Sequence, residues 1–132
     1  MLRERALRWA LGAGLLMPAG CFDSRATDKT PPVVITAEAK KEAEEIYAAR
    51  CASCHGAQGL GDGPKSAALR PQPRNLADKM WHSNVTDRYI ETIIANGGAA
   101  VGKSPLMLPN RDLATRPMVL AALRAYVRSF AN

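Results

Sequence analysis

The sequence predicts an all-α protein with one small folded domain. Apolar residues recur at helical spacing in three stretches, residues 36–50, 86–98 and 115–132, and no stretch alternates as a half-buried strand does. The chain of 132 residues has room for one domain. Long segments rich in Gly and Pro separate the helical stretches, and such loops are uncommon in a compact domain unless they enclose something. We therefore expect short helices wrapped around a bound group.

The first helical stretch, residues 36–50, leads directly into Cys51. Thr36 can accept a hydrogen bond from an amide of the first turn, and Glu38 suits the positive end of a helix. One face of this helix is apolar and should be buried, and it consists of Ala39, Ala43, Ile46 and Tyr47.

The second stretch, residues 86–98, has Thr86 as its candidate cap. Its end is marked by Asn96, Gly97 and Gly98, which favour a left-handed stop. The apolar stripe expected to be buried consists of Tyr89, Ile90, Ile93 and Ile94.

The third stretch, residues 115–132, has Thr115 as its candidate cap and Pro117 in its first turn, where the missing N–H is harmless. Arg124 and Arg128 are expected to face solvent near the negative end of the helix. The predicted apolar face consists of Val119, Leu123, Tyr126, Val127 and Phe130.

Residues 1–20 have the parts of a secretory signal peptide of the lipoprotein type. A basic start precedes a short apolar run at residues 9–17, and small residues then precede Cys21. This arrangement resembles the lipobox of bacterial lipoproteins, in which the Cys becomes the lipid-carrying N-terminus, although Pro18 stands where Leu is usual. The alternatives are ordinary secretion without a lipid on Cys21, or an uncleaved anchor. We then predict that residues 21–35 are a lipidated N-terminus with a flexible tether and that residues 36–132 are the folded domain.

The formal net charge is +6, and the Lys and Arg residues are scattered along the chain. Neither a basic tract nor interleaved aromatic residues occur. We therefore expect no nucleic-acid partner.

The segment "RCASCHGAQG" places Cys51, Cys54 and His55 within five residues. This Cys-X-X-Cys-His spacing is typical of covalent haem attachment. Two residues between the thiols put both sulfurs over one edge of a porphyrin, and the adjacent His reaches the iron. A redox disulfide and a structural zinc site are the alternatives, but the first favours a preceding strand and the second needs four ligands.

Glycines follow the histidine at unusual density. We expect them to let the backbone pass close to a flat ring. They are Gly56, Gly59, Gly61 and Gly63.

Residues 37–130 resemble the class I cytochrome c family, the small monohaem proteins of the bacterial periplasm. The resemblance rests on "CASCHG", supported by "GDGP", "PQPRNLAD", "GKSPLM" and the helix ending "AYVRSF". It implies the cytochrome c fold, with three to five short helices around one haem c attached through Cys51 and Cys54. It also implies His55 as the first axial ligand of the iron and a methionine as the second.

The resemblance places the ligand methionine in the loop before the last helix, which indicates Met107. One departure is that Leu108 stands where the family usually has Pro. Met80, Met118 and His82 are the other candidates, with core filling as the alternative role of Met118 and packing as that of His82.

Further roles come from the same resemblance. The carbonyl of Pro64 is expected to accept a hydrogen bond from the free N–H of His55. Arg74 is a candidate partner for a haem propionate, with a plain surface charge as its alternative role. Trp81 is a candidate for the haem edge or a propionate, with core packing as its alternative role. The first and last helices should cross where Ile46 or Tyr47 meets Leu123 and Tyr126.

These expectations predict a one-electron carrier, not an enzyme, because a His and a Met would fill both axial positions of the iron. Its partners would be donor and acceptor proteins that meet a haem edge ringed by Lys65, Lys79 and Lys103. The domain should be monomeric, exported to the periplasm and held at the membrane by lipid on Cys21. The alternatives are a haem sensor or peroxidase-like enzyme with a displaceable Met, and a cytochrome subunit of a larger dehydrogenase or oxidase.

Overall fold

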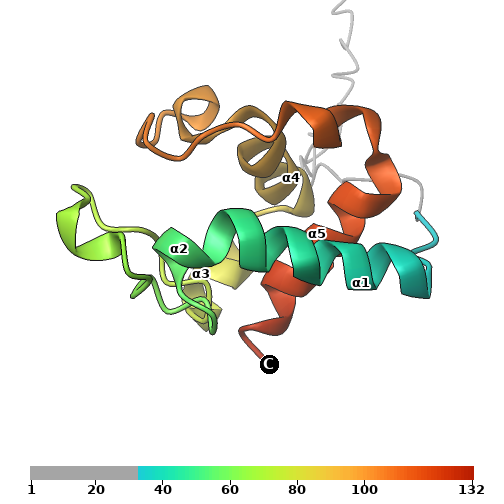
Figure 1. Cartoon of the computed structure of the whole chain (residues 1–132), viewed down its shortest axis with the longest axis horizontal. Helices are drawn as coiled ribbons and strands as arrows, with labels where there is room; N and C mark the ends of the chain where they lie inside the picture. The colour runs from blue at the N-terminus through green and yellow to red at the C-terminus, as the bar shows by residue number, and fades with distance from the viewer. Residues whose placement is uncertain (1–32) are drawn as a thin grey trace, which may run out of the picture.

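A computed structural model describes residues 33–132, and every regular element in this range is helical. The α-helices are α1 (Ala37–Ile46), α2 (Ala52–His55), α3 (Lys79–Asn84), α4 (Asp87–Asn96) and α5 (Pro117–Ser129), shown in Figure 1. The remaining elements are a π-helical turn, η1 (Tyr47–Cys51), and three 3₁₀ segments, η2 (Ser66–Ala68), η3 (Gly98–Val101) and η4 (Arg111–Thr115). The all-α prediction is confirmed for this range.

None of the helices in residues 33–132 is long and apolar enough to cross a membrane. The predicted signal peptide, Cys21 and most of the predicted tether lie outside the described residues.

The start of α1 follows the sequence closely. Thr36 Oγ1 accepts a hydrogen bond from the amide of Ala39 at 3.2 Å, as predicted for the cap. The pKa of Glu38 is lowered by a hydrogen bond from its own backbone N–H and then by Thr36. The apolar face predicted for this stretch is buried throughout.

The main contact of the core is the crossing of α1 and α5 (Figure 1). Tyr47, directly after α1, lies edge-on to Tyr126 with ring centroids 5.2 Å apart, and its ring centroid lies 5.1 Å from that of Phe130. Leu123 is completely buried beside them. The predicted meeting of the first and last helices is therefore confirmed.

The apolar stripe of α4 divides into two rows. Thr86 caps the helix by accepting from the amide of Tyr89 at 3.1 Å, as predicted. Ile90 and Ile94 are buried in the core, whereas Tyr89 and Ile93 line the pocket described below. Residues four apart lie on the same strip of a helix surface. One strip of α4 therefore faces the core and the adjacent strip faces the pocket.

Helix α4 ends at Asn96 and is followed by the cap residue Gly97, whose φ of +80° favours glycine. The predicted stop is thus found at the expected residue.

The beginning of α5 corrects one prediction. Thr115 belongs to η4, and its hydroxyl donates to the carbonyl of Asp112 at 3.1 Å, so it caps nothing. Arg116 occupies the cap position without a side-chain cap, and Pro117 is the first helical residue, as predicted. The hydroxyl of Thr115 is used inside the 3₁₀ turn that precedes α5, so it is not available to cap the helix.

The arginines of α5 correct a second prediction, because neither simply faces solvent. Arg124 contacts Glu91 at 2.9 Å and Asp87 at 3.2 Å. Arg128 donates to Asp87 at 2.9 Å and to the carbonyls of His82 and Val85 at 2.7 and 2.8 Å. These contacts join α5 to the end of α3 and the start of α4.

The glycine-rich loop after α2 packs against the chain itself. Gly59 has φ +72°, and a Cβ there would lie 2.9 Å from the Phe130 ring. At Gly63 a Cβ would lie 2.5 Å from the carbonyl oxygen of Ala52. None of the four glycines predicted to approach a flat ring lines the pocket. That prediction is wrong, because close approach of backbone to backbone and to the last turn of the chain is what requires glycine here.

Replacing Leu123 with Ala should lower the free energy of unfolding by about 2–5 kcal/mol, since it removes a fully buried side chain from the helix crossing. Denaturant titration followed by circular dichroism measures the loss. The control is Leu60→Ala, which removes the same atoms from a side chain that is 45% exposed and should cost clearly less. Equal losses would contradict the placement of Leu123 in the core.

Replacing Gly59 with Ala should destabilise the protein more than replacing Gly102 with Ala. Both glycines have positive φ, +72° and +69°, so both variants carry the left-handed strain of about 1–2 kcal/mol. Only Gly59 lacks space, and overpacking adds about 1–3 kcal/mol there. Around Gly102 nothing lies within 4 Å of the added carbon. Equal midpoints in denaturant would show that the Phe130 contact does not constrain the loop.

Candidate cofactor site

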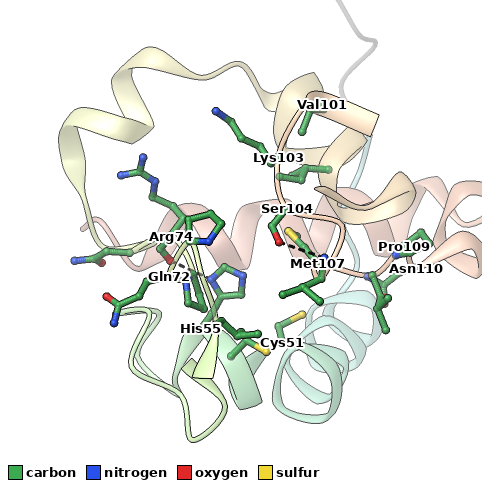
Figure 2. Close-up of a pocket in the computed structure, with 18 of the residues that line it drawn as sticks. Cys51, His55, Gln72, Arg74, Val101, Lys103, Ser104, Met107, Pro109 and Asn110 are labelled. Atoms are coloured by element: carbon green, nitrogen blue, oxygen red, sulfur yellow. Dashed lines mark hydrogen bonds between the residues drawn. The ribbon is translucent and has the colours of Figure 1, made fainter. Parts of the chain in front are cut away.

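A large pocket lies between the α2 side of the molecule and the loop that precedes α5. Its volume is about 1650 Å³, above the roughly 300–1,000 Å³ typical of small-ligand sites. Its lining includes Cys51, Cys54 and His55 from one side and Met107 from the other (Figure 2). The attachment motif and a methionine more than fifty residues further along the chain, predicted to serve one group, thus face one space that is large enough for a flat macrocycle.

Cys51 and Cys54 reach the pocket through a change of helical geometry. Cys51 ends the π-helical turn η1, and Cys54 lies in the short helix α2 that follows. A π-turn rotates the side chains after it relative to the preceding α-helix, and such turns are frequent at functional sites. The two thiols are free of any disulfide, and burial raises the pKa of Cys51 to about 11.

His55 is held by the backbone of a distant loop. Its Nδ1 lies 3.0 Å from the carbonyl oxygen of Arg74. Because a carbonyl only accepts, Nδ1 carries the proton and Nε2 keeps its lone pair. Burial lowers the pKa of the imidazole, which favours the neutral ring that a metal ligand needs.

The acceptor of this hydrogen bond corrects a prediction, because it is Arg74 and not Pro64. The amides of Gly63 and Lys65 donate to the carbonyls of Cys54 and Ser53 at 3.2 and 2.9 Å, which ties this part of the loop to α2. Pro64 is left exposed between them and does not line the pocket. The loop around residue 74 instead passes beside the imidazole (Figure 2).

Met107 lies across the pocket from His55 (Figure 2). Its amide donates to the carbonyl of Ser104 at 3.2 Å, and its carbonyl accepts from the amide of Gly98 at 2.9 Å. A Cβ on Gly97 would lie 2.8 Å from the Met107 carbonyl, and one on Gly98 would collide with the Ser104 carbonyl. These two glycines therefore follow the end of α4 and also leave space for residues 102–110, which we call the methionine loop. This second role was not predicted from the sequence.

The other candidate ligands do not line the pocket. Met80 is 71% exposed and Met118 is 39% exposed, so Met118 does not fill the core as its alternative role required. His82 is engaged at both ring nitrogens. Its Nε2 lies 2.6 Å from the carbonyl of Leu76, and its Nδ1 lies 3.1 Å from the guanidinium of Arg128. The packing role is the one that the structure gives to His82.

Arg74 and Trp81 both line the pocket. The Arg74 side chain is more than half exposed and lies 3.5 Å from Asp78. Asp78 also caps α3, a helix that the sequence analysis did not predict, by accepting from the amides of Met80 and Trp81. Trp81 packs against the core cluster. The assigned propionate contacts of Arg74 and Trp81 stay predictions.

The rim of the pocket carries fewer lysines than predicted. Lys65 and Lys103 line it, but Lys79 does not. Leu106 and Leu108, which flank Met107, line the pocket and are 57% and 73% exposed. Sequence reasoning also missed Arg50, Asn110 and Asp112 as lining residues.

Within residues 33–132, no group of three or more His, Cys, Asp or Glu side chains could by itself hold a metal ion.

The family model for cytochrome c matches residues 41–131, which include every residue that lines the pocket, from Arg50 to Asp112. A search of curated proteins finds no match. The cofactor of this family is a covalently attached haem c, and Cys51 and Cys54 have the spacing that attaches it. With the helical fold and the pocket lined by that motif, the match shows that the chain belongs to the cytochrome c family, whose members carry electrons on haem between redox partner proteins.

Proposed function

We propose that this protein is a class I, monohaem carrier of single electrons whose iron is ligated by His55 and Met107. The observation that carries the proposal is the position of these two side chains on facing sides of one pocket, beside the attachment cysteines (Figure 2). The hydrogen bond of His55 Nδ1 to Arg74 supports it, because it leaves Nε2 as the free ring nitrogen.

The bound haem supplies the reversible one-electron change, and the residues of this chain set its conditions. The thioether of Met107 favours the reduced iron and raises the potential relative to a second imidazole. Backbone hydrogen bonds hold Met107 from both sides, through Ser104 and Gly98. A ligand held in one position in both redox states keeps reorganisation small, which suits a carrier and leaves no open position for a substrate.

The rim offers a place for redox partners. Leu106 and Leu108 expose apolar surface beside Met107, and Lys65 and Lys103 place positive charge around the same opening. A small apolar patch with charged surroundings suits brief contact with a partner protein. The domain works as a monomer in this proposal.

The location is the second part of the proposal. An exported protein with lipid on Cys21 would hold the haem domain at the periplasmic face of a membrane. Residues 21–35 would supply the tether. The support is the sequence of residues 1–21 alone, with its basic start, apolar run and small residues before the cysteine.

Replacing Met107 with Ala should abolish the weak long-wavelength absorption band of Met-ligated ferric haem, while the haem stays on the protein through acid–acetone extraction. The reason is that the thioether is lost and the attachment through Cys51 and Cys54 is not. Absorption spectra of purified oxidised protein before and after extraction measure both effects.

The matched control is Met80→Ala, because Met80 is exposed and does not line the pocket. It should keep the band. If Met80→Ala loses the band and Met107→Ala keeps it, the assignment of the ligand is wrong. If extraction removes the haem from the wild-type protein, covalent attachment is wrong.

Cells expressing the wild-type chain and supplied with radioactive palmitate should label this protein, and Cys21→Ser should remove the label, because the thiol carries the lipid. Electrophoresis and autoradiography of membrane fractions give the result. An unlabelled wild-type protein recovered from the soluble periplasmic fraction would favour secretion without an anchor.

A further inference from the structure

An ion pair at the pocket joins Arg50, next to the attachment segment (residues 51–55), to Asp112, which lies just after the methionine loop. Arg50 directly precedes Cys51, and its Nη1 lies 2.9 and 3.0 Å from the two carboxylate oxygens of Asp112. The same nitrogen lies 3.4 Å from Asn110 Oδ1. All three residues line the pocket. The proposed electron-transfer function gives this contact no role.

Asn110 fastens the downstream end of the methionine loop. Its backbone amide and its side-chain Nδ2 both donate to the carbonyl of Ile94, at 3.1 and 3.0 Å. Upstream, the loop is fastened by the hydrogen bond from Gly98 to Met107. Both of these attachments lead to the end of α4 or to the residues directly after it, Ile94 in the first case and Gly98 in the second.

The Arg50 contacts are different in kind, because they lead across to the segment that carries Cys51. A haem joined covalently to Cys51 and Cys54 moves with that segment. A link from Arg50 to Asn110 and Asp112 therefore fixes the methionine loop relative to the haem and not merely relative to α4.

We propose that Arg50 is a positioning residue for Met107, acting through Asp112 and Asn110 to keep the thioether at the iron. The proposal rests on the His55–Met107 ligation proposed above. Arg50 and Asp112 are 43% and 48% exposed, so the pair adds little to global stability. Its effect falls on local opening of the loop, which needs far less free energy than unfolding.

The test measures how fast imidazole replaces Met107 in the oxidised holoprotein. At saturating imidazole the rate reports opening of the loop, and loss of the long-wavelength band follows it in a stopped-flow instrument. Arg50→Gln and Asp112→Asn should each raise the limiting rate about two- to fivefold, the range expected for an exposed ion pair of good geometry. The double variant should be no faster than Arg50→Gln alone, because that substitution already removes the pair with Asp112. Arg50→Lys should restore part of the effect.

The matched control is Glu42→Gln. Glu42 pairs with Arg116 at similar exposure, 38% and 41%, and neither residue lines the pocket. This variant should leave the exchange rate unchanged. Asp112→Asn keeps the test available if Arg50→Gln, next to Cys51, impairs haem attachment.

The outcomes separate the two proposals. A wild-type protein without the long-wavelength band overturns the Met107 ligation itself. A normal band with wild-type exchange rates in both Arg50→Gln and Asp112→Asn overturns only the positioning role. Equal acceleration in Glu42→Gln also overturns it, because general destabilisation would then explain the effect.

Discussion

The rest of the structure depends on Tyr47, which joins the core to the attachment motif. Its ring packs against the rings of Tyr126 and Phe130, which also contact each other. Its hydroxyl donates to the carbonyl of Gly56 at 2.8 Å, the residue directly after His55. Burial raises the pKa of this hydroxyl, so it remains a neutral donor. One side chain therefore fixes the α1–α5 crossing and the end of the Cys-X-X-Cys-His segment together, and the position of His55 follows from the packing of the core.

The pocket is a consequence of how few apolar residues this chain can bury by itself. Domains of about 100 residues bury a smaller fraction of their surface than larger domains do and have limited stability from burial alone. Here one row of α4 completes the core, while the row of Tyr89 and Ile93 faces the pocket with Trp81. A large, flat, mostly apolar cofactor can cover the side of this second row that faces the pocket. The haem of a cytochrome c thus serves as part of the folded interior as well as the redox centre.

Most features set by neighbouring residues agree with the sequence predictions, apart from the Thr115 cap, whereas contacts set by the path of a loop do not. The caps Thr36 and Thr86, the stop at Gly97 and the attachment motif each depend on residues within one turn, so the sequence suffices. The hydrogen-bond acceptor for His55 depends on which distant loop passes beside its ring. It is the carbonyl of Arg74, whereas the prediction is the carbonyl of Pro64. The arginines of α5 were placed in solvent because their partners on α3 and α4 become neighbours only after folding. The glycines after His55 do allow a close approach, as the sequence predicts, but the neighbours that approach them belong to the chain itself.

The two proposed axial ligands are held by different parts of the structure. His55 lies on the segment that carries the covalent attachment, and Tyr47 ties that segment to the core. Met107 lies in a loop fastened by a few backbone hydrogen bonds to the end of α4. Regions with few buried contacts open at lower free energy than the core around them. Ligand exchange should therefore begin at the methionine, and the side chains that tie this loop to the attachment segment decide how often it does.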